Sequence, residues 1–102
     1  MDRIKILTDF LRENPADSFS RHALALEYIK AGNDADARKL FEELLTSDPA
    51  YVGSYYHLAK LLERHGETEA AISWYEKGMD QAKLTGNEHA FRELRMAYEE
   101  LL

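Results

Sequence analysis

Residues 15–48, PADSFSRHALALEYIKAGNDADARKLFEELLTSD, decide the fold, because residues 49–82, PAYVGSYYHLAKLLERHGETEAAISWYEKGMDQA, repeat their pattern at an offset of 34 residues. Apolar, small and turn residues recur together at Asn14/Asp48, Pro15/Pro49, Ala16/Ala50, Ser20/Ser54, Leu24/Leu58, Ala25/Ala59, Gly32/Gly66, Ala37/Ala71, Phe41/Tyr75 and Glu42/Glu76. A fixed period in this range is typical of stacked supersecondary units. Such an architecture indicates a binding surface rather than a catalytic centre.

The composition excludes several classes of protein. A chain of 102 residues predicts one domain, and the absence of cysteine excludes disulfides, thiolate metal sites and thiol nucleophiles. Thirteen basic and nineteen acidic residues give a net charge of −6, which disfavours binding to nucleic acid or anionic membranes. No apolar run approaches the roughly 18 residues of a membrane span, and the opening MDRIK lacks the apolar core of a secretory signal. We expect a cytoplasmic protein.

The first predicted helix carries more apolar surface than one packing face needs. Its apolar residues at or beside helical spacing are Ile4, Ile6, Leu7, Phe10 and Leu11. At about 100° per residue these side chains span an arc of roughly 160°. Pro15 should end the helix at Asn14, because proline pushes its predecessor out of the α region. One side should pack on the next helix, and the remaining apolar edge has no obvious partner.

Each copy of the repeat predicts two helices joined by a tight turn. In the first copy a helix begins near Asp17 or Ser18, either of which can cap it, and Gly32 closes it in the left-handed conformation. Asn33-Asp34 makes the turn and caps a second helix, which residues 47–49, Ser-Asp-Pro, stop. Two helices connected in this way form a helical hairpin.

The second copy predicts the same hairpin with a longer second helix. The first helix of this copy is lined by Tyr51, Tyr55, Leu58, Ala59 and Leu62. Gly66 closes it, and Glu67-Thr68 offers a cap for the next helix. Lys83 stands where a closing proline is expected, so this helix should continue to about Leu84.

A sixth helix is predicted from about Glu88 to the C-terminus. Its apolar face holds Phe91, Leu94, Tyr98 and Leu101, and its other face holds Arg92, Glu93, Arg95, Glu99 and Glu100. One apolar and one charged face indicate a terminal capping helix.

These residues resemble the tetratricopeptide repeat (TPR), a 34-residue helix–turn–helix unit. The first copy supplies Leu24, Ala25, Tyr28, Gly32, Ala37, Phe41 and Pro49, and the second supplies Tyr55, Leu58, Ala59, Leu62, Gly66, Ala71 and Tyr75. The sequence departs from the family at Arg21, where a large apolar residue is usual, and at Leu44 and Gly78, where alanine is usual. The resemblance implies an all-α, TPR-like superhelix of antiparallel hairpins with about six helices. We expect a half-repeat helix over 1–14, repeats over 15–48 and 49–85, and a capping helix over 86–102.

The resemblance also implies a concave groove, lined by the first helix of each repeat, that binds a peptide or partner protein. The groove positions are Phe19, His22, Ala23, Leu26 and Lys30 in the first copy, and Gly53, Tyr56, His57, Lys60 and Arg64 in the second. Where some TPR domains hold a chaperone's C-terminal carboxylate with a basic residue and an asparagine, this chain has His22 and Leu26. No chaperone-tail binding of that type is expected. Lys30, Lys60 and Arg64 support only the hypothesis of a weak preference for acidic ligands.

No motif in the sequence indicates catalysis, a cofactor or a metal. The chain lacks a phosphate-binding glycine loop and an HExxH motif, and the pairs Glu42-Glu43 and Glu99-Glu100 are expected to be solvated charge. His22 and His57 form an incomplete metal site, because no carboxylate accompanies them at matched spacing. We predict a protein that is not an enzyme.

The alternative to a groove-binding adaptor is a structural subunit whose main partner is a second copy of itself. The surplus apolar residues of the first helix, Ile4, Ile6, Phe10 and Leu11, would form a homodimer interface. The competing interpretation is a monomer in which this edge folds back on the second helix.

Overall fold

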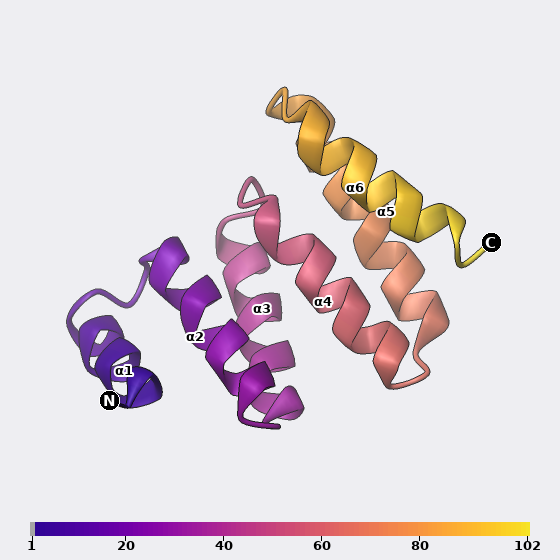
Figure 1. Cartoon of the computed structure of the whole chain (residues 1–102). Coiled ribbons are helices and arrows are strands. Elements are labelled where there is room, and N and C mark those ends of the chain that lie inside the picture. The colour runs from indigo at the N-terminus through magenta and orange to yellow at the C-terminus, as the bar shows by residue number, and fades with distance from the viewer. Residues whose placement is uncertain (1) are drawn as a thin grey trace. The chain divides into compact units, whose positions relative to one another are not determined.

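The computed structural model describes residues 2–102, which form six helices and no strand. The helices are α1 (Arg3–Glu13), α2 (Ser18–Lys30), α3 (Asp34–Ser47), α4 (Gly53–Arg64), α5 (Thr68–Leu84) and α6 (Glu88–Glu99) (Figure 1). The all-α fold class predicted from the sequence is confirmed.

The chain divides into two compact units at the junction of Asp48 and Pro49, where the second copy of the repeat begins. In the first unit, α1 packs on α2 and α2 packs on α3. In the second unit, α4 packs on α5, α5 packs on α6, and α4 also contacts α6 directly. The pairs α2–α3 and α4–α5 are antiparallel helical hairpins joined by short turns (Figure 1).

The helix ends follow the local signals in most places. Asp17 caps α2, because its Oδ2 accepts a hydrogen bond from the Ser20 backbone N–H at 2.9 Å. Gly32 and Gly66 have φ of +81° and +75°, a conformation that side chains disfavour, and each turns the chain out of its helix. α5 runs to Leu84, as the missing proline predicts.

Four details of the predicted helix ends are wrong. Neither Asn33 nor Glu67 caps the following helix with its side chain. Instead, the Asn33 N–H donates to the Tyr28 carbonyl at 2.8 Å, and the Glu67 N–H donates to the Leu62 carbonyl at 2.9 Å. Each of these bonds completes the preceding helix. Tyr51 lies ahead of α4 rather than in it, because a turn with Val52 N–H donating to the Ala50 carbonyl delays the helix to Gly53. α6 ends at Glu99 rather than at the C-terminus.

The core is built from the repeat positions. The fully buried apolar residues are Ala25, Ala37, Phe41, Leu44, Leu58, Ala59, Leu62, Ala71 and Tyr75. The four alanines have no exposed surface, so a larger side chain at any of them would overpack the core. Phe41 and Tyr75 fill equivalent places in the two repeats, and each has no exposed surface.

Candidate partner-binding surface

The second unit contains a cleft of about 450 Å³ between α4 and α6, lined by Tyr56, Lys60, His89, Arg92, Glu93, Met96, Ala97 and Glu100. Tyr56 and Lys60 are one helical turn apart, so they occupy one face of α4. The residues of α6 recur at intervals of three and four and likewise share a face. The cleft combines aromatic and thioether surface with side chains of both charges.

Lys60 is positioned by contacts on both sides. Its Nζ lies 5.7 Å from the ring centroid of Tyr56, within the range of a cation–π interaction, and 3.6 Å from Oε2 of Glu63. The hydroxyl group of Tyr75 donates a hydrogen bond to the same Glu63 oxygen. Burial, followed by this hydrogen bond to a carboxylate, raises the pKa of Tyr75 well above its usual range. The neutral phenol of the core therefore holds the carboxylate that orients Lys60.

His57 contacts a cleft residue, Tyr56, but is not among the residues that line the cleft. The side chain is half-buried, and its ring meets the Tyr56 ring edge-on with 5.7 Å between centroids. Burial lowers the pKa of His57 below its ordinary value, and the charge of Glu93 opposes that shift. Because its pKa lies below 6.5, the imidazole is mostly uncharged at neutral pH and contributes mainly packing. Arg64, the last residue of α4, is exposed and lies outside the lining of the cleft.

The predicted groove residues of the first unit lie on one face of α2. Phe19 is strongly exposed, and His22 and Leu26 are half-buried. The His22 ring meets the Phe41 ring edge-on at 5.8 Å between centroids, so its packing anchors α2 on α3.

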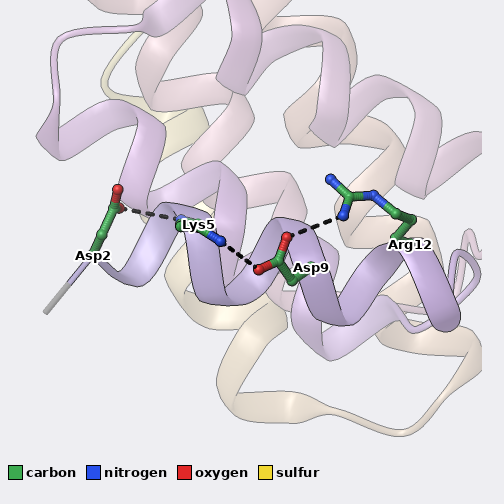
Figure 2. A network of polar contacts seen from close by, with 4 residues as sticks. All are labelled: Asp2, Lys5, Asp9 and Arg12. Atoms are coloured by element: carbon green, nitrogen blue, oxygen red, sulfur yellow. Dashed lines mark hydrogen bonds and ion pairs between the residues drawn. The ribbon is translucent and has the colours of Figure 1, made fainter.

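The predicted self-association residues divide into two sets on α1. Ile6 and Phe10 are 50% and 46% exposed, whereas Ile4 and Leu11 are half-buried. Beside them runs a ladder of alternating charge, which we define as Asp2, Lys5, Asp9 and Arg12 (Figure 2). Lys5 Nζ lies 3.0 Å and Arg12 Nη1 lies 3.3 Å from the carboxylate of Asp9, and Asp2 caps the helix through the Lys5 N–H. These bonds lower the pKa of Asp9.

Sequence reasoning missed the contribution of α6 to the cleft. Of the charged face predicted for the capping helix, Arg92, Glu93 and Glu100 line the cleft, and His89 and Met96 join them. The sequence did offer one signal for this wall of the cleft, because Met96 is an apolar residue among charged ones. In the structure its side chain is 67% exposed. Across residues 2–102 no three His, Cys, Asp or Glu side chains gather as a metal site would require.

Paired helices at a 34-residue period define a helical-repeat protein of the tetratricopeptide type. The sequence model of the tetratricopeptide repeat matches residues 22–82, more than half of the chain. The chain therefore belongs to the tetratricopeptide repeat family, and the resemblance stated from its residues is confirmed. Members of this family generally act as protein–protein interaction modules and are typically not enzymes. No curated protein matches the chain.

Solved structures agree with this assignment. A tetratricopeptide repeat domain protein from Salinibacter ruber, solved by NMR in solution, is 45% identical with a TM-score of 0.82, and the match covers 85% of this chain and 88% of that one. A crystal structure from the same organism is also 45% identical, with a TM-score of 0.80 and coverage of 83% and 94%. A protein from Bordetella parapertussis shares the fold alone, at 22% identity and a TM-score of 0.83 over 99% of this chain and 88% of that one. Within residues 2–102, no helix has both the length and the apolar character that crossing a membrane demands.

Proposed function

We propose that the second unit binds an extended or helical segment of another protein in the cleft between α4 and α6. The observation that carries the proposal is the exposed Met96 beside Tyr56 in a concave site. Methionine is over-used on surfaces that accept partner side chains, because its flexible thioether adapts to their shape. The cleft volume of about 450 Å³ lies in the range of sites that hold a ligand.

The charges of the cleft favour a partner segment of mixed charge. Lys60 and Arg92 would pair with acidic side chains, and Glu93 and Glu100 would pair with basic ones. A segment with an apolar anchor for Met96 and flanking charges of both signs therefore fits better than a purely acidic one. Phe19, His22 and Leu26 of α2 and Arg64 of α4 are not among the residues that line this cleft and remain separate predictions for the groove. A cytoplasmic location also remains a prediction.

The test uses short random peptides displayed on phage and selected on the immobilised chain. The affinity of the selected peptides is then measured by fluorescence anisotropy with the wild type and with the Tyr56→Ala/Lys60→Ala variant. We expect the double substitution to weaken binding at least about tenfold, because it removes an aromatic anchor and the charge that the anchor positions. The Met96→Ala variant should weaken binding by about fivefold.

The matched control is Leu84→Ala, which removes an exposed apolar side chain of α5 outside the cleft. This variant should bind as the wild type does, and urea unfolding should show that every variant is folded. Selected peptides that bind the Tyr56→Ala/Lys60→Ala variant with wild-type affinity would place the binding surface elsewhere.

A further inference from the structure

One exposed edge of α1 carries a stripe of four residues, Arg3, Ile6, Phe10 and Glu13, which we call the α1 stripe. Their spacing of three, four and three places them within an arc of about 80°. A positive charge therefore begins the stripe, two apolar side chains form its centre, and a negative charge ends it.

The two end charges oppose the helix dipole. Acidic residues are favoured near the N-terminus of a helix and basic residues near its C-terminus, and Arg3 and Glu13 reverse that preference. Arg3 gains an ion pair, because its Nε lies 3.4 Å from Oε2 of Glu27, yet its side chain stays 65% exposed. The exposed Glu13 at the last position of the helix has no comparable explanation in the stability of α1 itself.

The order of these residues makes the stripe complementary to itself. If a second copy is laid antiparallel against the first, Arg3 of one copy faces Glu13 of the other at both ends. Ile6 of each copy then meets Phe10 of the other in the centre. We propose that two copies of this chain associate through the α1 stripe in this antiparallel, two-fold symmetric arrangement.

Electrostatics favours α1 as the place where two copies meet. The chain carries a net charge of −6, so two copies repel each other over most of their surface. Residues 2–13 hold three acidic and three basic residues and are therefore neutral as a group. The ladder of Asp2, Lys5, Asp9 and Arg12 (Figure 2) also sums to zero, and Asp9 pairs within it with both Lys5 and Arg12. Helical spacing places this ladder beside the stripe, where it adds no net repulsion.

The association should be weak. One pair of helices of this length buries less than the roughly 1,200 Å² of a stable interface. The dimer is therefore measured by light scattering and sedimentation equilibrium at chain concentrations up to about 1 mM. A wild type that stays monomeric throughout this range would overturn the proposal.

The first pair of variants tests the apolar centre. Phe10→Asp should raise the dimer dissociation constant at least about tenfold, because it places like charges in the middle of the contact. The control, Leu84→Asp, adds the same charge at a leucine of α5 that is 79% exposed and lies off the stripe. The control should dimerise as the wild type does, and an equal effect of both substitutions would show that net charge, not the stripe, governs association.

The second set of variants tests the antiparallel register. Glu13→Arg and Arg3→Glu alone each place like charges opposite one another and should weaken the dimer by about fivefold. The double variant Arg3→Glu/Glu13→Arg restores opposite charges at both ends and should recover wild-type association. Thermal unfolding checks each fold, because Arg3→Glu also loses the pair with Glu27. A folded double variant as weak as the single variants would exclude this register.

Discussion

The carboxylate of Glu63 in α4 accepts a hydrogen bond from the hydroxyl group of Tyr75 in α5 and also pairs with Lys60 in the cleft. The Tyr75 side chain is fully buried, and Glu63 is half-buried between the core and the surface. One carboxylate thus connects the packing of the α4–α5 hairpin to the orientation of a residue proposed to bind the partner.

Tyr75→Phe should lower the free energy of unfolding by about 1–2 kcal/mol, because it removes a hydrogen bond to a charged group without opening a cavity. Urea unfolding measures the change. Tyr98→Phe is the matched control, since the Tyr98 hydroxyl donates to Glu76 at 3.1 Å at an exposed position, and its loss should cost less stability than Tyr75→Phe does. Equal losses in the two variants would show that burial adds nothing to the Tyr75 bond.

Tyr75 should also make the stability sensitive to alkaline pH. Burial raises the pKa of Tyr75 above the value of 10.0 for a free tyrosine, so the folded state holds the phenolic proton more tightly than the unfolded state. Its contribution is complete below pH 10.0 and is lost as the pH rises above that value. The wild type should therefore lose stability more steeply above this pH than Tyr75→Phe does, as measured by urea unfolding. Parallel profiles would contradict the buried, neutral phenol.

His57 should produce the opposite dependence at acidic pH. Burial lowers the pKa of His57 below 6.5, so the unfolded state binds the proton more readily than the folded state does. The stability that His57 contributes is present above pH 6.5 and is lost as the pH falls through the lower pKa of His57 in the folded state. His57→Gln should flatten the fall of unfolding free energy between neutral pH and pH 5, although Glu93 moderates the effect. An unchanged pH profile in the variant would assign the acid sensitivity to other groups.

Gly78 is buried where α5 crosses α4 and α6. A Cβ at this position would lie 2.7 Å from Cβ of Tyr55 and 3.0 Å from Cδ1 of Leu94. Gly78→Ala should therefore destabilise the protein by about 1–3 kcal/mol, because overpacking outweighs the roughly 1 kcal/mol that alanine gains in a helix interior. Leu94→Ala added to Gly78→Ala should not recover the loss, since the Tyr55 contact remains. A net gain in unfolding free energy for Gly78→Ala would mean that α5 shifts away from Tyr55.

Much of the fold could be predicted because its signals are local. Gly32 and Gly66 end helices through their own conformational freedom, and Asp17 caps α2 through a backbone group three residues away. The 34-residue offset added independent evidence for paired helices, which the fold confirms. The errors at Asn33 and Glu67 are also local, because backbone hydrogen bonds stand where side-chain caps were predicted. The error at Tyr51 arises because a backbone turn delays the start of α4.

The candidate site depended on contacts that the sequence does not mark. Tyr56 and Lys60 were predicted to face a groove. The sequence did not indicate that α6 contacts α4 and forms the other side of the cleft that these two residues line. The sequence alone did not explain why Gly78 stands where the family usually has alanine. The structure explains it, because Tyr55 leaves no room for a Cβ at this position.

The sequence by itself determined the helices, most of their ends and the repeat, because capping, glycine conformation and apolar periodicity act over a few residues. The tertiary structure alone decided which charged face lines a cleft and which buried hydroxyl meets Glu63. Those outcomes depend on how whole helices cross, and crossing is set by the summed packing of many side chains rather than by any single stretch.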